Sequence, residues 1–174
     1  MRITANGISI NYEIKGSGES LVLIHGAGDN LEMWYHQVPV LSRRYRVITP
    51  DTRGHGQTES PEARSSVPVF VEDVHELTKA VGIEKAYFLG YSMGGGIAIG
   101  LALKYPETVG ALILANTPIG SPPSAFFIER QRSNAGGLIL LQYFCSMVQT
   151  STKQLVLVGV PICMKLPKMA IWKL

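Results

Sequence analysis

One serine of the chain stands in a sequence setting that suits nucleophilic catalysis. Residues 90–95 read GYSMGG and lie between an apolar run typical of a buried strand and a helix-like segment rich in small residues. This is the context of a nucleophile elbow, in which a sharp, strained turn exposes the hydroxyl of the central serine, here Ser92. Gly90 and Gly94 lack the side chains that would collide across such a turn, and the amide of Met93 begins the helix unpaired, facing an oxyanion formed on Ser92. The competing interpretation is an ordinary glycine-rich turn.

A second motif, HGAG at residues 25–28, directly follows another apolar run. A tight loop at the end of a strand can supply a second oxyanion donor, most simply the amide of Ala27. His25 suggests itself as a catalytic base, but a histidine at a strand end more often serves as a hydrogen-bonding structural residue. We therefore assign the amides of Ala27 and Met93 to the oxyanion site and favour a structural role for His25.

A third motif, DTRGHGQT at residues 51–58, combines charged side chains with tight-turn glycines. It follows a further strand-like run, which puts it at the same sheet edge as the other two motifs. Asp51 and His55 are conceivable catalytic partners. We favour a structural role instead, in which Asp51 and Arg53 hold together the loop beneath the site.

Gly26, Trp34 and Tyr91 are our candidates for substrate binding. Residues 33–35 follow the HGAG loop, and two interpretations of them stay open: they line a pocket for the acyl group, or they form a helix that packs on the sheet. The sequence holds no cluster of metal-ligand residues. The GxGxxxG pattern of residues 94–100 is one step off a dinucleotide-binding fingerprint. We therefore expect neither a metal nor a cofactor.

Strand-like and helix-like segments alternate along the first two thirds of the chain. Apolar runs that suit buried strands lie at 21–26, 46–51, 85–90 and 110–116. Helix-like segments lie at 38–45, 69–81 and 94–105, and a hairpin turning at Asn6-Gly7 precedes them all. This alternation predicts an α/β fold with a mostly parallel sheet, flanking helices and right-handed crossovers. The next strand falls either at 154–159 or at 165–172.

Residues 1–120 resemble the N-terminal part of an α/β-hydrolase fold enzyme. The motifs at 25–28, 51–58 and 90–118 match that family in order and spacing, and the nearest branches are the 3-oxoadipate enol-lactonase-like and carboxylesterase-like serine hydrolases. The resemblance implies that Ser92 is the nucleophile and that the substrate is a small carboxylic ester or lactone. The haloperoxidase and C–C hydrolase branches of the family share the same elbow and remain alternatives.

The chain departs from the family in its second half. The family places an acid and then a histidine after the serine, yet all four histidines and all three aspartates of this chain precede Ser92. We interpret residues 1–120 as part of the hydrolase core and residues 121–174 as a cap-like segment with a divergent or truncated tail, so that the fold is incomplete at the C-terminus. An impaired hydrolase is then expected, and the alternative is a catalytically inactive fragment or an interaction module.

Composition narrows the remaining classes of protein. Of the 174 residues, 46% are apolar and 17% are charged, which excludes intrinsic disorder as the main state. The net charge of +3 gives no basic face for nucleic acid, and no run reaches the roughly 20 apolar residues of a membrane span. Two cysteines and an N-terminus without a signal-peptide pattern favour a cytoplasmic protein. We also expect self-association through an exposed sheet edge.

Overall fold

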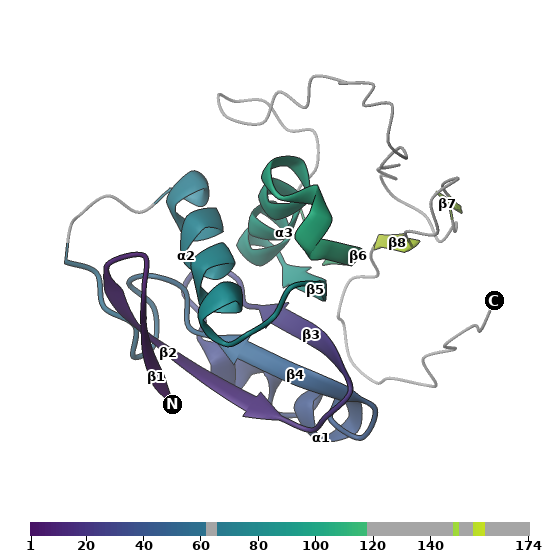
Figure 1. Ribbon diagram of the computed structural model, residues 1–174, viewed down its shortest axis with the longest axis horizontal. Helices are drawn as coiled ribbons and strands as arrows, with labels where there is room; N and C mark the ends of the chain where they lie inside the picture. Colours follow the sequence, from purple (N-terminus) through teal and green to yellow (C-terminus); the bar gives the residue numbers. More distant parts are fainter. Residues whose placement is uncertain (62–65, 118–147, 150–154, 159–174) are drawn as a thin grey trace.

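One sheet of eight strands runs through the part of the chain that the computed structural model describes, residues 1–61, 66–117, 148–149 and 155–158. The strands are β1 (Arg2–Ala5), β2 (Ile8–Lys15), β3 (Glu19–Ile24), β4 (Tyr45–Pro50), β5 (Ala86–Tyr91), β6 (Val109–Ala115), β7 (Val148–Gln149) and β8 (Leu155–Val158). Their order across the sheet is β1-β2-β4-β3-β5-β6-β8-β7 (Figure 1). The helical segments are η1 (Leu31–Trp34), α1 (Val38–Leu41), α2 (Val67–Ala80), α3 (Met93–Lys104) and η2 (Pro106–Thr108).

The centre of the sheet is parallel, as the alternation of apolar runs and helices predicts. Strands β4, β3, β5, β6 and β8 run parallel to one another, while β1, β2 and β7 pair antiparallel with their neighbours. Strand β8 lies within residues 154–159, one of the two segments expected to continue the sheet. The other segment, 165–172, and most of the cap-like region predicted for 121–174 lie outside the described residues.

The N-terminal hairpin turns where the sequence predicts it. Asn6 and Gly7 have φ angles of 47° and 74°, the left-handed conformations that a tight two-residue hairpin turn requires and that asparagine and glycine tolerate best. The chain then turns again at Gly16 and Gly18, but β2 does not pair with β3. Strand β4 lies between them, antiparallel to β2 and parallel to β3.

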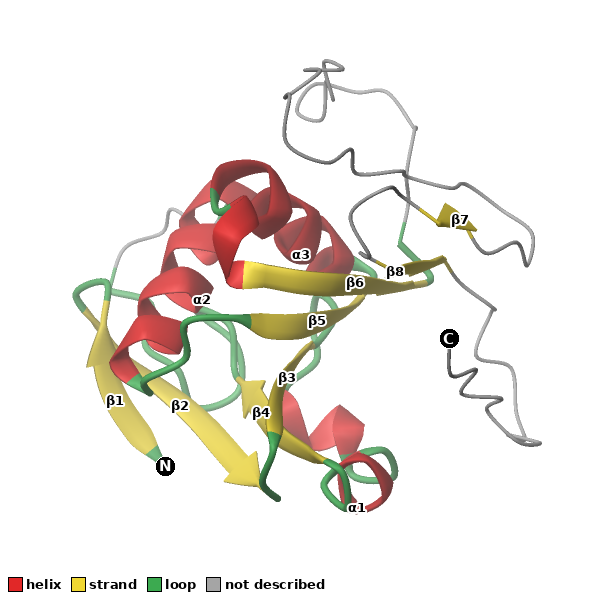
Figure 2. Ribbon diagram, turned by 45° about the vertical axis from the view of Figure 1, so that its right-hand side comes forward, coloured by secondary structure: helices red, strands yellow, loops and turns green. Residues whose placement is uncertain are grey.

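Helices cover both faces of the sheet. Helices α2 and α3 lie on one face, and η1 and α1 lie on the other (Figure 2). Because side chains alternate along a strand, Val22 of β3 joins the core beneath α2 and α3, whereas Leu21 and Leu23 pack with Trp34 on the opposite face. The carboxyl ends of the parallel strands meet at one edge, and the three chemical motifs follow directly from them.

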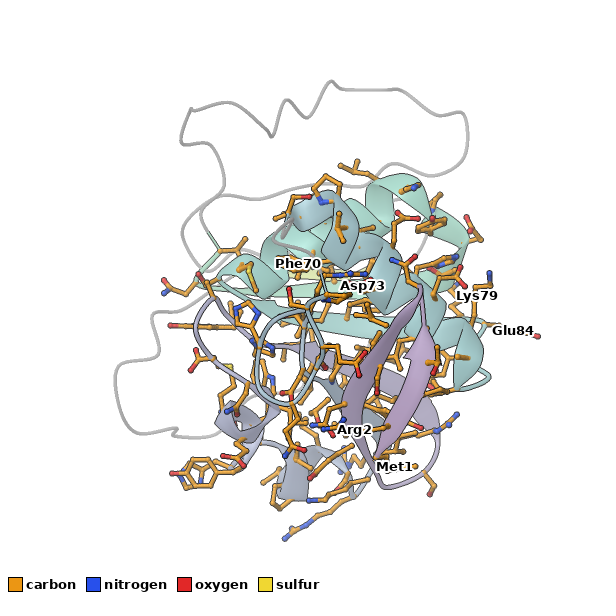
Figure 3. All side chains as sticks on the ribbon, turned by 90° about the vertical axis from the view of Figure 1, so that its left-hand side faces the viewer. Met1, Arg2, Phe70, Asp73, Lys79 and Glu84 are labelled. Carbon is orange, nitrogen blue, oxygen red and sulfur yellow. The ribbon has the colours of Figure 1, made fainter. Side chains whose placement is uncertain are left out.

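A buried ion pair fixes α2 to the N-terminal half of the fold. The guanidinium of Arg53 donates from Nε and Nη2 to both carboxylate oxygens of Asp73, at 2.8 and 2.7 Å. Asn6 Nδ2 donates to the same carboxylate at 2.7 Å. Asp73, labelled in Figure 3, therefore connects α2 with the loop after β4 and with the turn of the hairpin.

Candidate active site

The turn between β5 and α3 holds Ser92 in a strained backbone conformation. Its φ and ψ angles are 50° and −112°, a region that side-chain-bearing residues rarely adopt. Hydrogen bonds fix the turn on both sides: the amide of Ser92 donates to the carbonyl of Ala115 at 3.0 Å, and its carbonyl accepts from the amide of Gly95 at 3.0 Å. Strain of this kind persists only where the surrounding structure imposes it.

The glycines on either side of Ser92 are required by close packing. A Cβ atom at Gly90 would overlap the backbone of Gly94, and one at Gly94 would overlap the carbonyl groups of Ile24 and His25. The first turn of α3 therefore lies directly against the carboxyl end of β3. The predicted reason, a collision across the turn, agrees with this geometry for Gly90, whereas Gly94 is required by the neighbouring end of β3.

Strand register brings the HGAG motif alongside the elbow. Ile24 is the partner of Gly90 in the parallel pairing of β3 and β5, so the residues that follow each strand continue side by side. A Cβ atom at Gly26 would lie 2.9 Å from Cδ1 of Tyr91. The fold thus brings together Gly26 and Tyr91, two of the three residues predicted to bind substrate.

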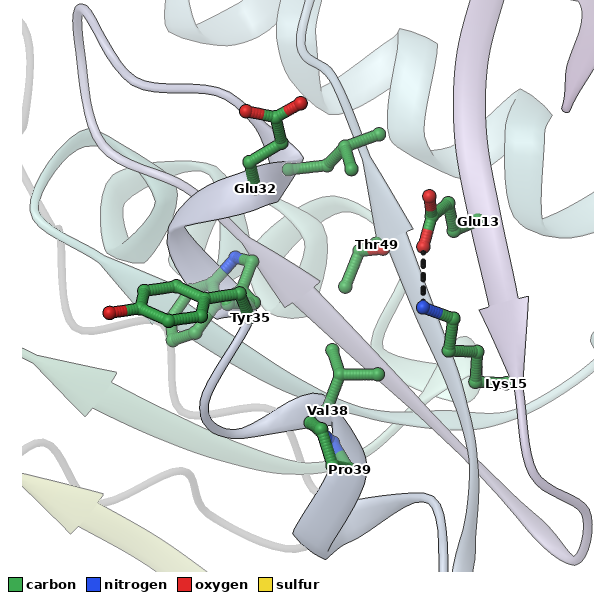
Figure 4. A pocket seen from close by; sticks show the side chains of 9 residues that line it. Glu13, Lys15, Glu32, Tyr35, Val38, Pro39 and Thr49 are labelled. Atoms are coloured by element: carbon green, nitrogen blue, oxygen red, sulfur yellow. Dashed lines mark ion pairs between the residues drawn. The ribbon is translucent and has the colours of Figure 1, made fainter.

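Trp34, the third of these residues, lies in the core. Its side chain is 2% exposed and packs with Leu21, Leu23 and Val38 on the α1 face of the sheet. This arrangement favours the alternative in which residues 33–35 form a helical segment that packs on the sheet. Trp34 also borders an open groove of about 530 Å³, where Lys15 and Glu13 of β2 form an ion pair at 3.1 Å (Figure 4).

The imidazole of His25 is fully buried and uses both ring nitrogens. Its Nδ1 lies 2.7 Å from the carbonyl oxygen of Gly26, and its Nε2 accepts from the amide of Thr52 at 2.9 Å. Burial lowers the pKa of His25 below its ordinary value, with a smaller contribution from the nearby His55. The neutral, fully bonded ring fits the structural role that we favour for it. Thr52, its partner, lies within the motif at 51–58, but sequence reasoning considered only Asp51, Arg53 and His55 there and assigned Thr52 no role.

The carboxylate of Asp51 joins three separate segments. It accepts from Asn11 Nδ2 at 2.8 Å, from the amide of Leu31 at 2.7 Å and from the amide of Gln57 at 2.8 Å. These bonds connect β2, the start of η1 and the loop after β4. A Cβ atom at Gly56 would overlap this carboxylate. The geometry agrees with the preferred structural role of Asp51 within the motif at 51–58.

The amides of Ala27 and Met93 have no hydrogen-bond acceptor in the described part of the chain. The hydrogen bonds of the elbow use the amides of Ser92, Gly95 and Gly96 but not that of Met93, and none within the described residues uses the amide of Ala27.

The described residues also contain no group of three side chains that could hold a metal ion. No helix among them is both long and apolar enough to cross a membrane.

Residues 19–138 match the model of a known family, the alpha/beta hydrolase fold. The chain belongs to the alpha/beta hydrolase fold family. Membership confirms the fold predicted from the motifs and from the alternation of strands and helices. The elbow at Ser92 and the HGAG loop lie inside the matched region.

The chain is similar to several members of this family, among them two relatives and one solved structure. The 2-hydroxymuconate semialdehyde hydrolase of Pseudomonas sp. (strain CF600) is 39% identical over 116 residues, which cover 64% of this chain and 41% of that protein. The 3-oxoadipate enol-lactonase 2 of Acinetobacter baylyi is 35% identical over 117 residues, 66% of this chain and 44% of the relative. The crystal structure of the enol-lactonase from Burkholderia xenovorans LB400 superposes with a TM-score of 0.65 at 34% identity, over 67% of this chain and 46% of that one. The chain spans less than half of the length of these alpha/beta hydrolases.

Proposed function

We propose that this alpha/beta hydrolase is a serine hydrolase of carboxylic esters or lactones. Ser92 Oγ attacks the substrate carbonyl, and the amides of Ala27 and Met93 hold the oxyanion that forms. The observation that carries the proposal is the strained turn at Ser92, with φ of 50° at the start of α3. Such strain suits a residue that the fold holds in place for chemistry.

The proposed hydrolysis has two steps, acylation of Ser92 and release of the acyl group by water. The oxygen of Ser92 forms an ester with the acyl group while the bond to the leaving alkoxide breaks, and water then cleaves that ester to release the acid. In a lactone both parts stay in one molecule. Each step needs a base that takes a proton from the attacking hydroxyl. His25 is unsuited to this, because both of its ring nitrogens are engaged.

The source of the base decides how active this chain is. All of its histidines precede Ser92, whereas the usual order is serine, acid and then histidine. In a well-studied protease, loss of the base lowers kcat about 10⁶-fold, while the oxyanion site and binding retain about 10³–10⁴ over water. We therefore propose that the chain is strongly impaired as a catalyst. The alternative is an inactive fragment or an interaction module.

The relatives support a small substrate with a reactive carbonyl. One is an enol-lactonase and another is a 2-hydroxymuconate semialdehyde hydrolase. The identity of 39% with the latter favours a second candidate reaction, hydrolysis of a carbon–carbon bond next to a carbonyl, at the same site. Gly26 and Tyr91 remain proposed contacts of the substrate, and their close approach beside the elbow supports this assignment.

A fluorophosphonate probe tests the proposal directly. We expect a covalent adduct on Ser92 of the full chain that forms slowly, because the hydroxyl lacks a base. The adduct should be absent in Ser92→Ala and unchanged in Ser17→Ala, which alters an exposed serine in the turn before β3. Mass spectrometry of the intact protein and of its peptides gives the readout. A folded protein that forms no adduct would contradict an activated serine and support the inactive alternative.

A further inference from the structure

We propose that His25 is a positioning residue that sets the direction of the Ala27 N–H bond. It does so by fixing the plane of the peptide between Gly26 and Ala27. The inference rests on the proposed function, in which this amide receives the oxyanion.

The hydrogen bonds of His25 define which ring nitrogen carries the proton. The backbone N–H of Thr52 can only donate, so the Nε2 atom that it meets at 2.9 Å must accept. The proton of the neutral ring is then on Nδ1, which donates to the carbonyl oxygen of Gly26 at 2.7 Å. The side chain is 0% exposed, so both bonds are shielded from bulk solvent. The hydroxyl of Thr52 also lies 3.1 Å from Nε2 and can donate to it beside the amide.

The carbonyl of Gly26 is therefore held from two directions. Besides the imidazole, the amide of Asp29 donates to it at 3.3 Å. Farther along the loop, the amide of Leu31 is fixed by the carboxylate of Asp51 at 2.7 Å. Between these points lie Ala27 and Gly28, both exposed, and Gly28 has a φ of 79°. The loop is thus fixed at its ends and presents its middle residues to the outside.

Planarity carries this constraint from the carbonyl to the amide. The described chain contains no cis peptide bond, and in a planar trans peptide the C=O and the next N–H point in opposite directions. Since the Gly26 carbonyl points toward the buried imidazole, the Ala27 N–H points away from it. A flipped peptide would present a carbonyl oxygen to the oxyanion in place of a donor, which is repulsive.

Asparagine and glutamine separate this role from simple packing. The side-chain nitrogen of asparagine reaches the position of Nδ1, so His25→Asn keeps the donor to Gly26 and loses the acceptor for Thr52. The oxygen of glutamine reaches the position of Nε2, so His25→Gln keeps the acceptor for Thr52 and loses the donor to Gly26. If His25 acted only through its bond to Thr52, glutamine would be the better replacement.

The test measures the orientation of the Ala27 amide in the full-length chain. We expect the residual dipolar coupling of the Ala27 N–H bond to be retained in His25→Asn and altered in His25→Gln. The rate of fluorophosphonate labelling of Ser92 should fall about 10²–10³-fold in the glutamine variant, the loss found when one oxyanion donor is removed. A wild-type coupling in His25→Gln, or the same change in both variants, would overturn the inference.

Two further readouts keep the inference separate from the proposed function. If the wild type forms no adduct on Ser92, the proposed function fails, and the dipolar couplings still decide whether His25 orients the amide. If the adduct forms but the coupling of His25→Gln is unchanged, the function stands and the inference fails. Should a variant not fold, ¹⁵N–¹H spectra of the wild-type ring decide: a proton on Nδ1 supports the inference, and a proton on Nε2 overturns it.

Discussion

Ser92 combines an unfavourable backbone conformation with backbone hydrogen bonds that hold it in place. A residue held in a sparsely populated backbone conformation costs about 1–3 kcal/mol, and the turn offsets this through bonds from the Ser92 amide to the carbonyl of Ala115 and from the Gly95 amide to the carbonyl of Ser92. Strand β6 and helix α3 therefore hold Ser92 in this conformation. At the residue scale, the candidate site depends on a serine whose backbone conformation is fixed by its neighbours.

His25 gives the free energy of unfolding a dependence on pH. Burial lowers its pKa below the ordinary value of 6.5; His55 lowers it further, and the bond to Gly26 and the charges of Asp51 and Asp29 only partly compensate. Near pH 6.5 the unfolded chain gains a proton that the folded chain does not bind. The contribution of His25 to stability is therefore complete above that pH and is lost as the pH falls toward and through its folded-state pKa.

Urea unfolding measured between about pH 5 and pH 8 checks this expectation. The free energy of unfolding should fall more steeply with decreasing pH below 6.5 in the wild type than in His25→Asn, which has no titrating group at this position. Identical slopes in the two proteins would show that His25 is protonated equally in the folded and unfolded states.

At the scale of elements, the position of α2 depends on the ion pair between its Asp73 and Arg53 of the loop after β4. Asp73→Ala removes the carboxylate that compensates the buried guanidinium of Arg53, where the two side chains are 10% and 5% exposed. We expect a loss of about 3–5 kcal/mol in the free energy of unfolding, as for other broken buried pairs. Glu76→Ala, which breaks an exposed pair with Lys79 on the same helix, should cost at most about 0.5 kcal/mol.

Urea unfolding of both variants provides the comparison. Both replacements introduce alanine into α2, and helix propensity favours the replacement of aspartate more than that of glutamate. A larger loss of stability in Asp73→Ala therefore reports the buried pair and not the helix itself. Similar stabilities of the two variants would mean that Asp73 does not hold α2 to the hairpin and to the loop after β4.

At the scale of the whole molecule, strands β1 and β7 lie at the ends of the described strand order. Edge strands present unpaired backbone groups that can pair with another chain. We therefore predict that the protein associates with copies of itself. Sedimentation velocity over a range of protein concentrations should give a sedimentation coefficient that rises with concentration. A constant monomer value at all concentrations would contradict this prediction.

The local elements were predictable because their signals are local. Apolar runs followed by glycine indicated β3 and β5, and helical spacing indicated α2, although that helix begins at Val67, before the predicted 69. The same local reasoning left residues 33–35 undecided. It could not tell whether Trp34 would meet a substrate or the core, because both outcomes use the same apolar side chain.

The sequence by itself determined that a serine would lie in a tight turn between a strand and a helix, because the glycines at 90 and 94 and the flanking apolar pattern are neighbours in the chain. Only the tertiary structure decided that β4 lies between β2 and β3, and that Thr52 meets His25 from 27 residues away. It also decided that Asn11 meets Asp51 across 40 residues. Contacts between distant residues depend on which strands become neighbours, and periodicity along the chain does not encode that choice.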